Sequence, residues 1–262
     1  MPSGNVVMKV VILAGGLGTR ISEETHSRPK PMVEVGDRPL IWHIMKTFSH
    51  YGHLEFIICC GYLGYVIKEY FSNYTLHMSD VTVDMERDSV LVHRRNAEPW
   101  KVTLVDTGAD TLTGGRLKRV ESFLDDDPFF FTYGDGLSDV DLNRLMAFHI
   151  SHGRKASVTA VKPPGRFGVL ELDGNRVSDF TEKPVESVGR INGGYFVLNK
   201  SCLEYIDGDL IPWEGEPLRN LVMDDELRAY KHDGFWQPMD TLRDKRLLEQ
   251  LWATGSAPWK VW

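Results

Sequence analysis

A glycine-rich segment near the start of the chain has the composition of a phosphate-binding loop. Residues 13–20 read LAGGLGTR and follow directly on an apolar, mostly β-branched run. Glycines let the backbone approach a ligand closely, and consecutive N–H groups can cradle phosphate oxygens. The spacing excludes a dinucleotide fingerprint counted from Gly16, because Ile21 stands where that motif needs Gly or Ala, and the Gly-Thr-Arg ending excludes a P-loop. The segment is therefore a candidate nucleotide site of another kind.

A lysine between two prolines follows this loop, in the sequence Pro29-Lys30-Pro31-Met32. The prolines restrict the backbone, so Lys30 presents its charge at one place, which suits a phosphate that must be met in a fixed position. Together with Arg20 and the glycine loop, Lys30 predicts a triphosphate site. The alternative is a strand-to-loop turn that carries two solvated cations.

Two aspartates far apart in the sequence are candidate ligands for Mg²⁺. Asp135 follows the aromatic run 129–133, and Asp240 follows residues 236–239 just before an expected helix. A hard Mg²⁺ ion takes one or two carboxylates together with phosphate oxygens and waters. The alternatives are that Asp135 is a turn residue and that Asp240 is a helix N-cap.

Apolar strands alternate with helical segments in the first part of the chain. We expect strands over residues 10–14, 54–60, 102–105 and 128–133, and helices over 39–51, 62–74, near 115–123 and over 141–152. This alternation is typical of a parallel sheet covered on both faces. After about residue 160 the pattern changes to shorter strands at 157–162, 168–172, 177–181 and 191–198, with a last helix over 241–254. The fold class is therefore α/β, with a mostly parallel central sheet, helices on both faces and a β-rich C-terminal elaboration.

Composition narrows the class of protein further. The 262 residues carry 30 Lys and Arg against 37 Asp and Glu, a net charge of −7, which argues against nucleic-acid binding. No apolar run reaches the ~18 residues that a membrane-spanning helix needs. The three cysteines cannot form a disulfide framework, and adjacent Cys59 and Cys60 point to opposite faces of a strand. We expect a cytoplasmic protein with no membrane or nucleic-acid partner.

Several motifs together resemble the sugar-phosphate nucleotidyltransferase family along nearly the whole chain. They are residues 13–20 with Pro29-Lys30-Pro31-Met32, then Gly134-Asp135-Gly136, residues 180–184 and residues 191–194. The resemblance implies a Rossmann-like single domain over 1–262, with a nucleotide-binding half at about 8–160 and a sugar-phosphate-binding half at about 161–262. It implies attack by a sugar 1-phosphate oxygen on the α-phosphorus of a nucleoside triphosphate, with Mg²⁺ as cofactor and pyrophosphate leaving.

One branch of that family, which uses CTP and glucose 1-phosphate, resembles the chain at 61–62, 105–108, 113–116 and 235–241. The alternatives are the same reaction with dTTP, UTP, GTP or another sugar 1-phosphate, and a nucleotide-sugar sensor without turnover. Residues 1–7 and 185–190 depart from the family pattern. The resemblance also implies a homo-oligomer.

The resemblance assigns roles to individual residues. Arg20 and Lys30 would be catalytic, on the β/γ- and α-phosphates, and Asp135 and Asp240 would bind the metal. The nucleotide-binding residues would be Leu13, Ala14, Gly15, Gly16, Leu17, Gly18, Thr19, Arg20, Lys30, Thr111 and Arg116. The sugar-phosphate residues would be Glu182, Lys183, Asn192 and Gly193. Arg116 either donates to a pyrimidine carbonyl or is an exposed residue that opens a helix.

Two other groups of side chains predict no separate site. The histidine pairs His50 with His53 and His149 with His152 lie in the last turns of expected helices without a third ligand, which argues against zinc. The tryptophans near the C-terminus indicate packing against the body or another subunit.

Overall fold

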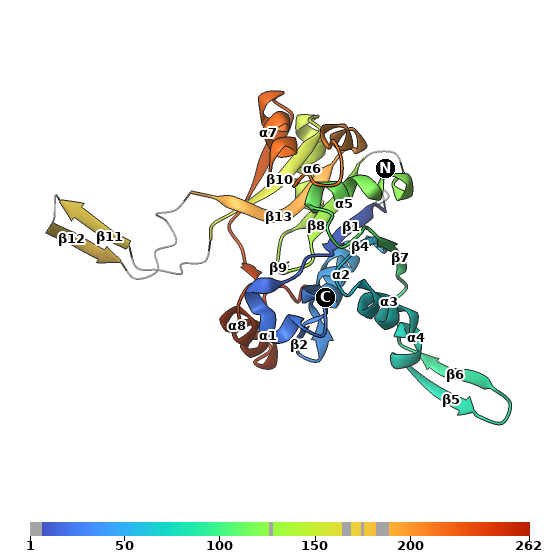
Figure 1. The fold of residues 1–262 in the computed structure, drawn as a ribbon. Helices are drawn as coiled ribbons and strands as arrows, with labels where there is room; N and C mark the ends of the chain where they lie inside the picture. Colours follow the sequence, from blue (N-terminus) through green and yellow to red (C-terminus); the bar gives the residue numbers. More distant parts are fainter. Residues whose placement is uncertain (1–6, 126–127, 164–168, 174–175, 182–188) are drawn as a thin grey trace, which may run out of the picture.

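A seven-stranded sheet forms the centre of the computed structural model, which describes residues 7–125, 128–163, 169–173, 176–181 and 189–262 (Figure 1). In sheet order the strands are β14 (Leu227–His232), β10 (Ala156–Val161), β13 (Ile191–Leu198), β8 (Phe129–Tyr133), β1 (Lys9–Ala14), β4 (Glu55–Cys60) and β7 (Lys101–Asp106). Neighbouring strands run parallel except at β13, which is antiparallel to both neighbours. The mostly parallel sheet expected from the sequence is confirmed, and β10, β13 and β14 extend it with later parts of the chain.

The central strands are apolar on both faces because both faces are covered. Alternate residues of β1 and β4 enter two separate cores, so that Cys59 lies in one core and Cys60 in the other. The three cysteines are free and buried, as expected. Side chains of successive strand residues point to opposite faces, so one strand supplies both cores.

Helices cover the two faces. They are α1 (Ser22–Thr25), α2 (Leu40–His50), α3 (Gly64–Ser72), α4 (Tyr74–His77), α5 (Thr113–Arg119), α6 (Leu142–His152), α7 (Glu216–Met223) and α8 (Leu242–Ala253). Buried residues of α2, α6 and α8 pack in the core that contains Val10 and Ile12, whereas Leu117 of α5 and Leu221 of α7 pack in the core that contains Val11. Short 3₁₀ helices lie at Thr19–Ile21, Lys30–Met32, Glu121–Phe123 and Lys200–Tyr205.

Helix ends follow local capping chemistry. The Asp141 side chain accepts the Arg144 N–H at the start of α6, and Gly153 ends that helix with a φ of 63°. The N-cap of α8 is Thr241, which forms a capping box with Asp244, so the interpretation of Asp240 as the N-cap is wrong. The expected helix over 62–74 is two helices, α3 and α4, and the segment near 115–123 is α5 followed by a 3₁₀ turn.

Four two-stranded sheets complete the structure. They pair β2 (Glu34–Val35) with β3 (Arg38–Pro39), β5 (Ser79–Asp84) with β6 (Ser89–Arg95), β9 (Gly136–Ser138) with β15 (Trp236–Pro238), and β11 (Val169–Asp173) with β12 (Arg176–Thr181). The β5–β6 hairpin extends away from the body (Figure 1). Sequence reasoning missed this hairpin because its strands have no buried apolar face to create a clear alternation.

The C-terminal tryptophans pack against the body. Trp259 is fully buried, and its indole N–H donates to Nδ1 of His43 in α2 at 3.3 Å. Trp252 stacks on Trp259 and lies so close to Gly36 that a Cβ there would be 1.9 Å from the indole ring. The last segment of the chain thereby fixes the β2–β3 turn that follows Lys30.

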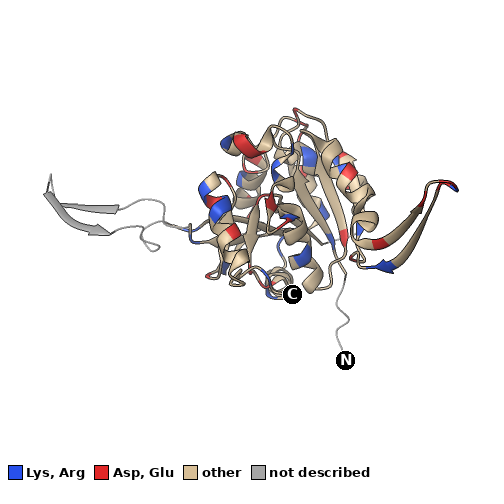
Figure 2. Cartoon of the chain, turned by 90° about the horizontal axis from the view of Figure 1, so that it is seen from below, with Lys and Arg blue, Asp and Glu red and all other residues tan. Residues whose placement is uncertain are grey.

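The charged side chains are mixed in sign. Figure 2 shows Lys and Arg interspersed with Asp and Glu along the helices and strands that it colours. Among the described residues, no helix is long and apolar enough to cross a membrane.

Candidate active site

The carboxyl ends of the parallel strands bring the candidate loops to one edge of the sheet. Leu13 pairs with Tyr133 in β8, and Ala14 pairs with Cys60 in β4, so the loops that follow these strands start side by side. A cavity of about 460 Å³ opens there, a volume within the range of small-molecule sites. It is lined by Leu13, Ala14, Gly16, Gly18, Thr19, Arg20, Lys30, Pro31, Thr113, Tyr133, Gly134, Asp135 and Glu214. Most of the predicted nucleotide residues therefore lie together.

The glycines of the loop serve different needs. Gly18 has a φ of 64°, a left-handed conformation that favours glycine, and precedes the 3₁₀ turn that carries Arg20. A Cβ on Gly15 would lie 2.2 Å from Nη1 of Arg116. The missing side chain at Gly15 therefore makes room for the Arg116 guanidinium. A Cβ on Gly16 would meet nothing within 4 Å, because this residue faces the open cavity.

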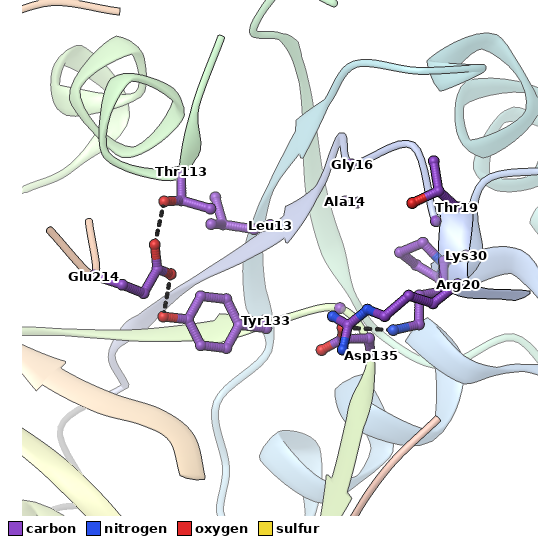
Figure 3. A pocket seen from close by; sticks show the side chains of 13 residues that line it. Leu13, Ala14, Gly16, Thr19, Arg20, Lys30, Thr113, Tyr133, Asp135 and Glu214 are labelled. Atoms are coloured by element: carbon purple, nitrogen blue, oxygen red, sulfur yellow. Dashed lines mark hydrogen bonds and ion pairs between the residues drawn. The ribbon is translucent and has the colours of Figure 1, made fainter. Parts of the chain in front are cut away.

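Lys30 occupies the centre of the charged end of the cavity. Its side chain is buried in a 3₁₀ turn between the two prolines, and its Nζ donates to Asp135 Oδ2 at 2.8 Å and to Asp240 Oδ1 at 2.7 Å. The exposed Arg20 side chain donates to the other oxygen of Asp240 at 2.8 Å. The fixed cation predicted from the prolines is thus held between two carboxylates that lie 105 residues apart in the sequence. Figure 3 shows its contact with Asp135.

The two aspartates have the chemistry of a divalent-cation site. Both lie within hydrogen-bond distance of the same ammonium group, so their oxygens converge on one point. One or two carboxylates beside a phosphate-sized space match the preference of Mg²⁺, which completes its shell with phosphate oxygens and water. The described residues contain no cluster of three or more His, Cys, Asp or Glu that could hold a metal without a substrate. The donor set therefore fits a metal that binds together with a nucleotide.

A smaller hollow of about 40 Å³ adjoins the cavity. Asn192 and Gly193 line it, as does Trp236, whose indole N–H donates to the Gly193 carbonyl at 2.7 Å. Tyr133 and Asp135 line both spaces and form the wall between them. Glu182 and Lys183, the other predicted sugar-phosphate residues, lie outside the described part of the chain.

The end of the cavity opposite Lys30 carries a hydroxyl–carboxylate network that sequence reasoning missed (Figure 3). Glu214 accepts from Thr113 Oγ1 at 2.6 Å and from the Tyr133 hydroxyl at 2.5 Å, and Asn192 Nδ2 donates to the Tyr133 oxygen at 3.3 Å. Burial and the Glu214 charge raise the pKa of Tyr133, which keeps its hydroxyl protonated as a donor. Glu214 lies in an irregular segment without a motif, so the sequence held no signal for it.

Some predicted nucleotide residues do not line the cavity. Arg116 is buried in α5, where its guanidinium donates to Thr107 Oγ1 at 2.8 Å and to the carbonyls of Gly108 and Ala109 at 2.7 and 3.0 Å. The interpretation of Arg116 as an exposed helix-opening residue is therefore wrong, since close packing under Gly15 buries it. Its contact with a base stays a prediction, as do the roles of Thr111 and of the exposed Leu17.

The histidine pairs have structural partners. Nδ1 of His149 and Nε2 of His152 both contact the Ser157 hydroxyl, at 3.0 and 2.7 Å, and His53 accepts the Met8 N–H. These contacts engage ring nitrogens of His149, His152 and His53 with side-chain and backbone groups.

The chain matches known proteins over nearly its full length. Residues 9–237 match the family model described as Nucleotidyl transferase. The chain is 59% identical over 256 residues to glucose-1-phosphate cytidylyltransferase from Salmonella typhi, covering 97% of this chain and 100% of that protein. It is 42% identical over 257 residues to the probable glucose-1-phosphate cytidylyltransferase of Bacillus subtilis, with 97% and 100% covered.

A solved structure shares the fold. HddC from Yersinia pseudotuberculosis superimposes with a TM-score of 0.68 at 21% identity, covering 94% of this chain and 99% of that chain. Nucleotidyltransferases of this family generally use a divalent metal, which agrees with the donor set at Asp135 and Asp240. The sequence matches confirm the resemblance found in the motifs: the chain belongs to the nucleotidyl transferase family of enzymes.

Proposed function

We propose that this enzyme transfers a cytidylyl group from CTP to α-D-glucose 1-phosphate and gives CDP-glucose and pyrophosphate. The observation that carries the proposal is the cluster of Arg20, Lys30 and Asp135 at one end of a nucleotide-sized cavity beside the glycine loop. Asp240 lies behind this cluster and contacts both cations. The choice of CTP and glucose 1-phosphate rests on the names of the relatives at 59% and 42% identity.

The residues of the chain align and neutralise the reacting groups. The loop amides at Gly16 and Gly18 hold the triphosphate, Arg20 meets the departing β/γ-phosphates, and Lys30 meets the α-phosphate. Lys30 reaches this position from a buried turn between two prolines, so its charge is oriented before substrate binds. Transfer of a nucleotidyl group needs alignment and charge neutralisation, and no nucleophilic Ser or Cys is required.

Asp135 and Asp240 would hold the metal, which we propose is Mg²⁺. The bound ion would supply positive charge that reduces the repulsion between the two anionic substrates. Lys30 donates to the same two carboxylates and offsets their charge. The ammonium group thereby offsets the repulsion between two carboxylates that lie close together in the folded chain.

The sugar phosphate would enter from the smaller hollow. Asn192 and Gly193 line that space, and Asp135 borders both it and the nucleotide cavity. Lys183 would pair with the sugar phosphate and Glu182 would accept from sugar hydroxyls, as the family resemblance implies. The geometry supports two adjacent subsites separated by a thin wall.

We further propose a cytoplasmic homo-oligomer. The β5–β6 hairpin exposes Val83, Met85 and Leu91, and a second copy of the chain would bury these side chains. The free, buried cysteines suit a reducing compartment. We expect light scattering to give a mass of several chains, and a mass equal to one chain would contradict the oligomer.

Pyrophosphate release tests the proposed function. Native protein with glucose 1-phosphate and Mg²⁺ is supplied with CTP, dTTP, UTP, GTP or ATP in parallel. We expect strong release with CTP alone. Release with another nucleotide would overturn the choice of base, and no release from folded protein that binds nucleotide would overturn the reaction. Lys9→Ala is a matched control, because Lys9 lies in the same sheet but pairs with Asp125 outside the cavity.

A further inference from the structure

Glu214 is fixed at the rim of the cavity by the segment that carries it. The neighbouring Trp213 is fully buried, and its backbone N–H donates to Thr113 Oγ1 at 2.8 Å. The N–H groups of Gly114 and Gly115 donate to the Ile211 carbonyl at 3.0 and 3.2 Å. These contacts dock the segment onto the start of α5, so the exposed Glu214 carboxylate has a defined position over the cavity.

The carboxylate keeps unused acceptor capacity. Its two oxygens offer about four lone-pair sites, and two of these receive the hydroxyls of Thr113 and Tyr133. Both hydroxyl oxygens already accept a hydrogen bond themselves, from Trp213 N and Asn192 Nδ2, which directs their protons toward Glu214. The remaining lone pairs of Glu214 are therefore the acceptors that this side of the cavity offers to a ligand.

Charge decides which ligand group can bind there. Within the described part of the chain, no ion pair to Lys or Arg neutralises Glu214, whereas Asp240 at the opposite end has two such partners. An unneutralised carboxylate repels phosphate and accepts from a neutral donor. Glu214 lines the nucleotide cavity and contacts Tyr133, which lines both spaces and accepts from Asn192 of the smaller hollow. In both proposed substrates a sugar ring is bonded directly to a phosphate, so a sugar hydroxyl is a neutral donor close to the phosphate-binding end of the cavity.

We propose that Glu214 binds a sugar-ring hydroxyl of a substrate and selects for hydroxylated over deoxygenated ligands. This inference rests on the proposed function, because the hydroxyl belongs either to the ribose of the nucleotide or to the hexose of the sugar phosphate. Acidic side chains bind ribose hydroxyls in the same manner in dinucleotide sites. A carboxylate held by two donors from different elements loses little freedom when it binds, which favours selectivity.

The test compares Glu214→Ala and Glu214→Gln with native protein on matched ligand pairs. Calorimetry measures binding of CTP, 2′-deoxy-CTP and 3′-deoxy-CTP, and steady-state kinetics compare glucose 1-phosphate with its monodeoxy analogues. A hydrogen bond to a charged acceptor predicts that native protein prefers one hydroxylated ligand by about tenfold or more, and that Glu214→Ala abolishes this preference. If Glu214→Ala changes the ratios among the CTP analogues, the bound hydroxyl belongs to the ribose. If it changes the ratios among the glucose 1-phosphate analogues, the bound hydroxyl belongs to the hexose.

Other outcomes overturn the inference. Ratios that stay within about twofold of native in both variants contradict a hydroxyl contact, and so does a change confined to the preference for CTP over UTP, which would indicate a base amine. Glu214→Gln keeps the shape of the side chain if Glu214→Ala fails to fold. Glu216→Gln is the matched control, since this exposed carboxylate lies two residues on and outside the cavity lining. Absence of native turnover would refute the proposed function alone, because calorimetry of CTP and its two deoxy analogues does not depend on turnover.

Discussion

Replacing Lys30 with Met removes the charge between the two aspartates and keeps most of the side-chain length. In native protein Nζ lies 2.8 Å from Asp135 Oδ2 and 2.7 Å from Asp240 Oδ1. The Arg20 side chain, which also donates to Asp240, is 72% exposed. The variant therefore removes the cation that both carboxylates share.

The size of the effect follows from burial. Removing one partner of a buried ion pair costs about 3–5 kcal/mol. The Asp135 side chain is 34% exposed, and water screens part of its charge, so we expect a loss of about 2–3 kcal/mol. At about 2–4 °C per kcal/mol for a chain of this size, Tm falls by about 5–10 °C. Turnover falls by more than about a hundredfold, because the α-phosphate loses its fixed cation.

Differential scanning fluorimetry in EDTA and then in Mg²⁺ checks this reasoning, together with pyrophosphate release. Mg²⁺ should restore part of the lost Tm in Lys30→Met and change native protein little, because the cation would neutralise the two carboxylates that Lys30 neutralises in native protein. Lys9→Ala should keep native turnover. A Tm within about 2 °C of native in EDTA, or no gain from Mg²⁺, would refute the placement of Lys30 between the carboxylates.

Three further predictions concern other parts of the molecule. Burial lowers the pKa of His43 and of His53 to about 4 from 6.5, so the unfolded chain binds more protons between these values. The free energy of unfolding therefore falls as pH drops from about 7 to about 4, by up to about 3 kcal/mol per histidine. Urea midpoints that stay constant over this range would contradict the prediction. The same pH dependence should remain in His50→Gln, because His50 is exposed. Gly36→Ala should destabilise the chain by about 2 kcal/mol or more, because φ at Gly36 is 58° and the new Cβ would meet Trp252. Gly189→Ala is the control and should leave Tm unchanged, because a Cβ at Gly189 would meet no atom within 4 Å. Lys183→Ala should raise KM for glucose 1-phosphate about tenfold or more, and an unchanged KM would remove Lys183 from the sugar-phosphate site.

The sequence predicted the sheet and the charged end of the cavity because both leave local signals. Uninterrupted apolar runs identified β1, β4 and β8, since a strand buried on both faces needs apolar residues at every position. The glycine loop and the prolines around Lys30 are short motifs with a direct physical meaning. The family resemblance predicted that Asp135 and Asp240 act together, and in the structure both contact the Lys30 ammonium group.

The parts that sequence reasoning missed depend on contacts between distant segments. Glu214 reaches the cavity because Trp213 and Ile211 dock on α5, about 100 residues earlier in the chain. The space that Gly15 leaves free for the Arg116 guanidinium is one such contact, between residues about 100 positions apart. The β5–β6 hairpin has exposed strands, so the alternation that identifies a half-buried strand is absent.

Isotope transfer tests the central claim most directly. Native protein is incubated with glucose 1-phosphate and Mg²⁺, once with CTP labelled at the α-phosphorus and once with CTP labelled at the γ-phosphorus. We predict that the α-label appears in CDP-glucose and the γ-label in pyrophosphate. Transfer of the γ-label to the sugar product, or no transfer of either label by folded protein, would contradict attack of the sugar phosphate on the α-phosphorus.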